Sequence, residues 1–180
     1  MKSYVILLRG VMPTGKTKVS MAKLRSVLSA GSFENVRTYI ASGNALVETG
    51  LSAKAAEQRV HELIKQHIGP DLVVVARTGA QLRKMLDENP FGKGCDVSRV
   101  FFTSFVVPPP PQKVKELLRQ DFSPEKLVIT KRGGYLCIPG SAARSKLSNN
   151  FLERKLGVSA TTRNFNTLSK LATMARIAAP

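Results

Sequence analysis

The chain has 180 residues, enough for one domain or two small ones, and its 43% hydrophobic content is that of a soluble globular protein. No apolar stretch approaches the ~20 residues of a membrane span, which excludes a spanning protein. The 28 Lys+Arg against 12 Asp+Glu give a formal net charge of +16, which favours phosphate-bearing ligands or nucleic acid. The alternative is a solvated basic surface without a specific ligand.

Two features bear on the compartment of the protein. The N-terminus opens in a strand-like run without the cleavage region of a signal peptide. Cys95 and Cys137 form no CxxC pair, and we expect free thiols in a reducing compartment rather than a disulfide. The sequence therefore predicts a cytoplasmic protein that does not interact with a membrane.

Apolar runs and capping residues divide the first half of the chain. The run Tyr4–Arg9 is short, apolar and followed by glycine, which is typical of a buried strand. Ser20 and Ser52 can each cap a helix, and Thr78 with Gln81 has the capping-box spacing. The predicted elements are strand Tyr4–Arg9, a helix from Ser20 to Gly31, strands Val36–Ile40 and Ala45–Glu48, a helix from Ser52 to Gly69, strand Leu72–Ala76 and a helix from Thr78 through Leu86.

The same order returns after a turn-rich break at Asn89–Gly94. The predicted elements are strand Val100–Val107, helix Gln112–Arg119, strand Leu127–Lys131, turn Arg132–Gly134, strand Tyr135–Ile138, helix Ser148–Leu156, an extended piece Ser159–Thr162 and a final helix to about Ala175. The repeated β-α-β-β-α-β order predicts an α+β fold of two tandem ferredoxin-like halves, 1–90 and 91–180, packed as one unit. We expect mostly antiparallel sheets with helices on one face.

The ends of the two halves also match residue by residue. Four positions correspond at a constant offset of 86, three of them identical and one a similar apolar residue: Arg77, Leu82, Lys84 and Met85 correspond to Arg163, Leu168, Lys170 and Leu171. Together with the repeated element order, this match favours an internal duplication.

The predicted topology brings two loops together. The first two strands run in the same direction, so the loop after the first and the hairpin after the second leave the sheet at one edge. We therefore expect the Arg9–Lys18 loop beside the Ser42–Asn44 turn, with glycine or asparagine at a positive φ. By the same argument, Pro108–Pro111 should lie near Arg132–Gly134.

The string Gly10-Val-Met-Pro-Thr-Gly-Lys-Thr17 has the spacing of a phosphate-binding P-loop, GxxxxGK[ST]. A working P-loop opens a helix at its Gly-Lys, and a second strand supplies an aspartate for Mg²⁺. Here the best cap is Ser20, and neither Val100–Val107 nor Val73–Ala76 supplies that aspartate. The context argues against a P-loop, and a nucleotide-dependent enzyme stays an alternative.

Several short stretches of the chain resemble the sequence motifs of a protein family. They are Leu7–Gly10, Lys16–Lys18, Phe33–Asn44, Arg144–Leu147, Glu153–Gly157 and Thr161–Thr167. Together they resemble a bacterial family known as domain of unknown function 1697, over nearly the whole chain. Relatives have Asn-Val-Gly-Gly-Lys where this chain has Met12-Pro-Thr-Gly-Lys16, so the comparison makes the P-loop match accidental. The resemblance implies a compact α+β fold and no established activity.

A first group of candidate anion ligands comes from the predicted sheet edge. Arg9 closes a buried strand, where a charge must reach solvent, a partner or a ligand. The alternatives are that Arg9 pairs with a carboxylate such as Glu48 and that Asn44 only completes the turn. The candidates are Arg9, Gly10, Lys16, Lys18 and Asn44.

A second group lies in the C-terminal third, where residues 131–180 carry nine Lys/Arg and one acid. These charges are mixed with apolar residues, which predicts a folded basic face. The string Arg163–Thr167 is expected to begin the last helix, whose N-terminus suits phosphate, with Phe165 available to stack on a base. The alternative is an asparagine cap with Phe165 in the core. The candidates are Arg144, Lys146, Arg163 and Asn164.

No spacing indicates a catalytic or metal centre. His61 and His67 are six residues apart with no Cys or Asp nearby, so we expect neither a metal nor a cofactor. The chain is therefore interpreted as binding a phosphate-bearing ligand, with nucleic acid favoured over a small nucleotide. The alternatives are a phosphate-handling enzyme using Gly10–Thr17 and a protein-interaction module.

Overall fold

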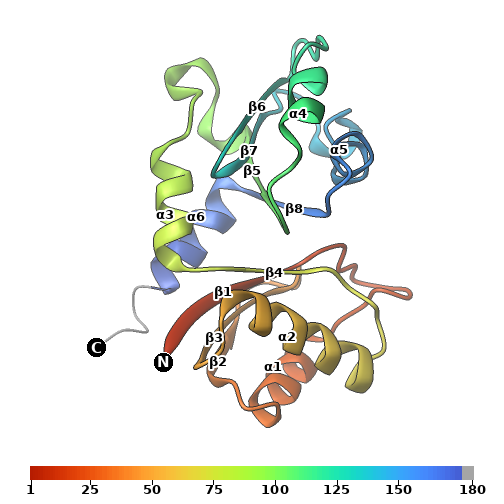
Figure 1. Cartoon of the computed structure of the whole chain (residues 1–180), viewed down its shortest axis with the longest axis vertical. Helices are drawn as coiled ribbons and strands as arrows, with labels where there is room; N and C mark the ends of the chain where they lie inside the picture. The colour runs from red at the N-terminus through yellow and green to blue at the C-terminus, as the bar shows by residue number, and fades with distance from the viewer. Residues whose placement is uncertain (176–180) are drawn as a thin grey trace. The chain divides into compact units, whose positions relative to one another are not determined.

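The computed structural model describes residues 1–175 and has an α+β fold, as predicted, with two four-stranded antiparallel sheets and six α-helices (Figure 1). The strands are β1 Lys2–Leu8, β2 Glu34–Thr38, β3 Asn44–Thr49, β4 Val74–Arg77, β5 Val100–Phe105, β6 Lys126–Thr130, β7 Gly133–Cys137 and β8 Ala160–Asn164. The helices are α1 Met21–Ala30, α2 Ala53–His67, α3 Gly79–Asp87, α4 Pro111–Leu117, α5 Asn149–Leu156 and α6 Phe165–Met174.

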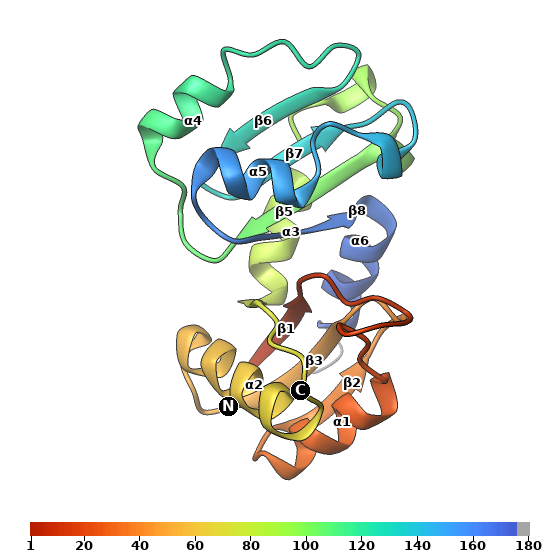
Figure 2. The same ribbon diagram turned by 90° about the vertical axis from the view of Figure 1, so that its right-hand side faces the viewer.

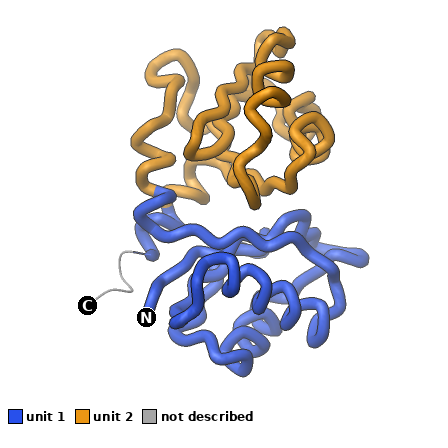
Figure 3. The backbone as a smooth tube through the Cα atoms, viewed as in Figure 1, with its two compact units in different colours: residues 1–82, 170–180 blue, residues 83–169 orange. Residues whose placement is uncertain are grey.

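The chain divides into two compact units (Figure 3). Unit 1 comprises Met1–Leu82 together with the chain from Lys170 on, and unit 2 comprises Arg83–Ser169. The chain therefore passes from unit 1 to unit 2 within α3 and returns within α6. The halves 1–90 and 91–180 that the sequence indicates stay a prediction.

The sheet of unit 1 has the strand order β2-β3-β1-β4, with β1 antiparallel to both neighbours. Figure 2 shows β1, β2 and β3 of this sheet. Alternate residues of β1 face the helices α1 and α2, because side chains of a strand point to opposite faces with period two. Tyr4, Ile6 and Leu8 pack there with Leu24 and Ile64, all of them buried. Each fully buried aliphatic side chain of this kind contributes about 1.5–3 kcal/mol.

The helices of unit 1 begin where the capping residues predict. The Ser20 hydroxyl accepts the amide of Lys23, and the Ser52 hydroxyl accepts the amide of Ala55. At α3 the Thr78 amide donates to Gln81 Oε1 at 2.8 Å, and the Gln81 amide donates to Thr78 Oγ1 at 3.2 Å. The predicted capping box is confirmed, because both reciprocal bonds are formed.

The end of α6 is bonded to the sheet of unit 1. Arg37 on β2 donates from Nη2 to the carbonyl of Met174 at 3.1 Å, which ties the end of α6 to this sheet. Such a bond satisfies one of the carbonyls that a helix C-terminus leaves free. The C-terminal part of α6 therefore completes unit 1.

Unit 2 has the strand order β6-β7-β5-β8, and β5 is antiparallel to β7 and β8. Helices α4 and α5 supply Leu117, Leu152 and Leu156 to a core that includes Phe105 and Leu136 of the sheet. The same layer of helices on an antiparallel sheet therefore occurs in both units.

The hairpin between β6 and β7 corrects one detail of the sequence analysis. Gly133 and Gly134 lie inside β7, and the turn consists of Lys131 and Arg132. Gly133 has φ +151°, and a Cβ there would overlap the carbonyl oxygen of Thr103 on β5. These glycines therefore allow β7 to approach β5 closely, and they do not form the turn.

The cysteines form a disulfide, so the expectation of free thiols was wrong. Cys95 and Cys137 are bonded with a Cα–Cα distance of 6.1 Å, across 42 residues of sequence. The pairing of Val100 with Cys137 places the end of β7 beside the chain that leads into β5. Strand register creates this proximity, and sequence spacing does not reveal it. The correction also removes the cysteine argument for a reducing compartment.

Within residues 1–175, no helix combines the length and the apolar character that crossing a bilayer requires.

We predict that Gly133→Ala lowers the free energy of unfolding by about 2–4 kcal/mol, because the new methyl group meets backbone at a left-handed φ. Chemical denaturation monitored by circular dichroism measures this. The control is Gly140→Ala, where a Cβ has open space and which should stay within about 0.5 kcal/mol. Equal stability of the two variants would contradict the assigned packing.

Candidate functional site

The loop after β1 and the turn before β3 lie against each other in unit 1. The amide of Leu8 donates to the carbonyl of Gly43 at 2.8 Å. Gly43 has φ +79°, and a Cβ on it would lie 2.6 Å from Val11 Cγ2. The predicted proximity of the two loops is therefore found, with glycine at the positive-φ position. We call the loop Arg9–Lys18 together with the turn 40–43 the cationic corner.

The loop of the cationic corner is closed by its own backbone. The Met12 amide donates to Thr17 O at 3.4 Å, and the Lys18 amide donates to Gly15 O at 3.2 Å. Gly10 and Gly15 have positive φ, which lets the chain reverse. The side chains of Lys16 and Lys18 are exposed, and within residues 1–175 neither has an ion-pair or hydrogen-bond partner. The loop thus presents two cationic side chains without partners, and its shape is fixed by its own backbone hydrogen bonds.

This loop does not open a helix as a P-loop does. Helix α1 begins at Met21 behind the Ser20 cap, four residues beyond Thr17. The amide of Lys18 is used within the loop, so it does not point to a ligand. The string Gly10–Thr17 therefore lacks the helix N-terminus that contributes to phosphate binding in P-loop proteins.

Arg9 is partly exposed, and its backbone amide donates to Val73 O at 3.0 Å. The pairing of Arg9 with Glu48 that the sequence left open is wrong. Glu48 is opposite Ser3, at the other end of β1, and it accepts from Asn35 Nδ2 at 2.7 Å. Strand register separates the two charges by the length of β1.

Asn44 is buried and completes the turn. Its Nδ2 donates to Tyr39 O at 3.1 Å and to Ser42 Oγ at 3.0 Å. This is the structural role that the sequence analysis gave as the alternative to ligand binding. The amide thereby fixes the turn on which the loop rests.

The cationic corner contains a residue that the sequence analysis missed. Ile40 has φ +49° and is 49% exposed. A β-branched residue in the left-handed region is strained by about 1–2 kcal/mol, and such strain is concentrated at functional sites. Met12 on the facing loop is also exposed, so apolar groups accompany the two lysines. No local sequence signal marks Ile40, because positive φ is usually a property of glycine and asparagine.

In unit 2, Arg163 lies on β8, opposite Phe102 of β5, and not at the start of the last helix. Its Nη1 donates to Thr161 Oγ1 at 2.7 Å and to Thr162 O at 2.9 Å. Burial lowers the pKa of Arg163 to about 10. The expectation that Arg163 begins the helix was wrong, because β8 continues through Asn164 and α6 starts at Phe165.

Asn164 caps α6, since its Oδ1 accepts the amide of Thr167 at 2.9 Å. The ring of Phe165 lies 6.2 Å from that of Phe102, centroid to centroid. These contacts agree with the alternative that the sequence analysis gave for Arg163–Thr167, in which the asparagine caps the helix and Phe165 packs in the interior.

Arg144 and Lys146 lie near each other in sequence and are both exposed. Arg144 ends a short 3₁₀ turn, Ala142–Arg144. The pKa of Asp121 lies below the usual range because the Ser123 hydroxyl and amide donate to it, with a further contribution from the charge of Lys146. Lys146 is therefore partly balanced by an acid. The structure places this pair and the cationic corner in different units.

No group of three or more metal-binding side chains converges among residues 1–175. Arg132 of the basic C-terminal third pairs with Glu88 at 3.0 Å, and Arg176 of the same set lies outside the described residues.

The fold and these sites define an α+β protein with two antiparallel four-stranded sheets and solvent-facing cations. The chain belongs to the family described as protein of unknown function (DUF1697), which matches residues 1–135. It is similar in fold to the conserved bacterial protein SP0830 from Streptococcus pneumoniae, with a TM-score of 0.74 and 22% sequence identity, over 98% of this chain and 99% of that one. No curated protein matches the sequence.

We predict that Asn44→Ala lowers the free energy of unfolding by about 1–3 kcal/mol, because the partly buried carbonyl of Tyr39 loses its side-chain donor. Urea denaturation measures the effect. Asn166→Ala, at an exposed position of α6, should change stability by less than about 0.5 kcal/mol. If Asn44→Ala is as stable as the parent protein, the amide does not hold the turn.

We predict that NMR titration of the Asp121 carboxyl gives a pKa below that of an exposed aspartate and that Ser123→Ala raises it. A lowered pKa means that this carboxylate stabilises the fold at neutral pH and that the contribution is lost as the pH falls through the folded-state pKa. Lys146→Ala should raise the pKa by less than Ser123→Ala, because Lys146 is the lesser cause. The opposite ranking would show that Lys146 is the main partner.

Proposed function

We propose that this protein binds a phosphate-bearing ligand at the cationic corner and that the preferred ligand is nucleic acid. The observation that carries the proposal is the pair of side chains of Lys16 and Lys18, which are exposed and have no partner within residues 1–175, on a loop closed by its own backbone hydrogen bonds. A loop that is ordered before binding loses less entropy on binding, so its charges contribute more to affinity.

The surroundings of the two lysines favour a nucleic acid over free phosphate. Exposed Met12 and Ile40 lie on the two segments of the corner and offer apolar contact to sugars or bases. The net charge of +16 attracts a polyanion over distance and weakens that attraction as salt is added. A nucleic acid can contact both the lysines and these apolar side chains, whereas a single phosphate contacts only the lysines.

We also propose that the two units are tandem ferredoxin-like halves derived from an internal duplication. The identical strand orders support this proposal. Arg77 and Arg163 support it further, since each lies opposite a residue of the central strand, Val5 or Phe102. Each also donates its Nη1 to the carbonyl of the preceding residue, at 2.8 Å for Arg77 and 2.9 Å for Arg163.

Fluorescence anisotropy with a labelled single-stranded RNA tests the proposed ligand. We predict that Lys16→Ala/Lys18→Ala weakens binding and lowers the slope of log K against log salt by about 1.4, since each lost phosphate contact to a single strand removes about 0.7. The control is Lys2→Ala/Lys54→Ala, which removes the same charge. Lys2 is opposite Thr49 at the other end of β1, and Lys54 follows in the first turn of α2, so both lie away from the corner.

Equal loss of affinity in the two double variants would overturn the proposal, because the binding would then follow overall charge. Either of two other outcomes would replace the proposed ligand-binding function with a different function. Mg²⁺-dependent nucleotide turnover that disappears with Lys16→Ala identifies an enzyme, and a co-purifying protein that resists nuclease identifies an interaction module.

A further inference from the structure

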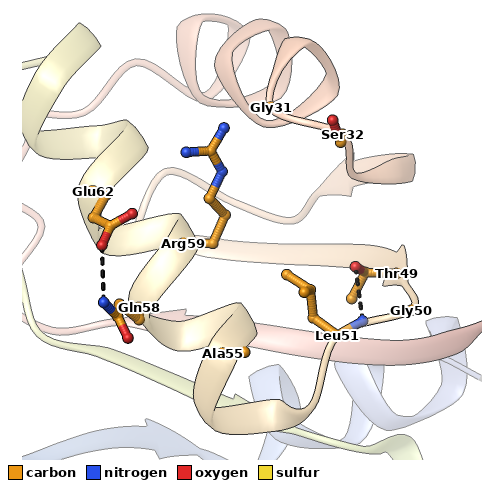
Figure 4. A pocket seen from close by; sticks show the side chains of 9 residues that line it. All are labelled: Gly31, Ser32, Thr49, Gly50, Leu51, Ala55, Gln58, Arg59 and Glu62. Atoms are coloured by element: carbon orange, nitrogen blue, oxygen red, sulfur yellow. Dashed lines mark hydrogen bonds between the residues drawn. The ribbon is translucent and has the colours of Figure 1, made fainter.

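A groove in unit 1 between α1 and α2 contains two hollows, of about 430 and about 380 Å³, which share Gly31 and Arg59. The larger hollow lies among the end of α1, the turn after β3 and the first turns of α2 (Figure 4). Its volume is within the range of roughly 300–1,000 Å³ typical of small-molecule sites. The groove is separate from the cationic corner, since none of its lining residues belongs to the corner.

The end of α1 is shaped around this groove. A Cβ on Gly31 would overlap Cδ1 of Leu63 on α2, so glycine permits the close approach of the two helices. The next residue, Ser32, takes the left-handed conformation with φ +71°, a position where helix ends usually carry glycine. The chain thus accepts local strain at Ser32, whose side chain lines the larger hollow.

The larger hollow contains one cation and one acid that do not pair with each other. Arg59 reaches from α2 toward the end of α1 at Gly31 (Figure 4). Glu62, three residues further along α2, is near enough in sequence to pair with it. Instead, Glu62 Oε1 accepts from Gln58 Nε2 at 3.0 Å. Within residues 1–175, the Arg59 guanidinium has no hydrogen-bond or ion-pair partner.

We propose that this hollow binds a small zwitterion of the α-amino-acid class. The Arg59 guanidinium would hold the carboxylate, and the Glu62 carboxylate would hold the ammonium group. A guanidinium binds a carboxylate through two parallel hydrogen bonds, and a carboxylate accepts more bonds than the single one from Gln58. Leu51, which is 39% exposed, and Ala55 provide apolar surface for the ligand's side chain.

The charges of the hollow select against other classes of ligand. One cation and one acid sum to zero, so a phosphate dianion gains from Arg59 and is repelled by Glu62. A plain carboxylate leaves Glu62 without a cation, and a plain amine leaves Arg59 without an anion. The zwitterion is the class that satisfies both groups at once.

The test uses three probes that share the isobutyl group of leucine, titrated into the full chain and followed by amide NMR shifts. L-leucine has both charges, 4-methylpentanoate lacks the amine and 3-methylbutylamine lacks the carboxylate. We predict that leucine, titrated to about 10 mM, shifts the amides of Ser32 and Gly50 with a Kd on the order of 1 mM. Each of the other probes should bind at least about tenfold more weakly.

Three variants accompany the probes. Arg59→Ala should raise the leucine Kd at least about tenfold, whereas Arg119→Ala, an exposed arginine of unit 2, should leave it unchanged. Glu62→Gln should weaken leucine binding without weakening 4-methylpentanoate. Unchanged amide positions elsewhere in the spectrum establish that each variant is folded. The proposal is overturned if leucine causes no shifts, if either single-charge probe binds as well as leucine, or if Arg59→Ala retains the parent affinity.

Discussion

The register between β1 and β3 is the constraint on which the candidate site of unit 1 depends. Leu7 is opposite Asn44, and the next amide along β1 bonds to the carbonyl of Gly43. Tyr4 to Leu8 are all buried, so a shift of one residue would exchange the side chains of β1 between the two faces of the sheet and would remove Tyr4, Ile6 and Leu8 from the core that they form with α1 and α2. The packing of Tyr4, Ile6 and Leu8 against α1 and α2 therefore favours this register, and the register places the basic loop on the turn before β3.

The sequence predicts features of this fold that depend on local chemistry. Ser20, Ser52 and the Thr78–Gln81 box begin helices because a side-chain oxygen satisfies a free amide nearby in the chain. The proximity of the basic loop and the turn also follows, because element order sets strand direction. Helix starts can be predicted from residues that are close in the sequence, and the proximity of the loop and the turn can be predicted from the order of the elements.

Features that depend on strand register were not predictable from the sequence. The disulfide Cys95–Cys137 and the separation of Arg9 from Glu48 arise from which residues are opposite each other across the sheets. The start of α6 was misplaced because β8 runs directly into the helix, with no turn residues between them. Arg59 was missed because its availability depends on a bond between Gln58 and Glu62, and the same three residues are compatible with an Arg59–Glu62 pair.

The return of the chain through α6 has a consequence for how the protein can be cut or assembled. Unit 1 is built from two separate stretches of the gene, with the whole of unit 2 inserted between them. A fragment that stops before Lys170 lacks Met174, whose carbonyl is bound by Arg37. During synthesis on the ribosome, the hydrogen bond between Arg37 and Met174 can therefore form only after the last helix has been made.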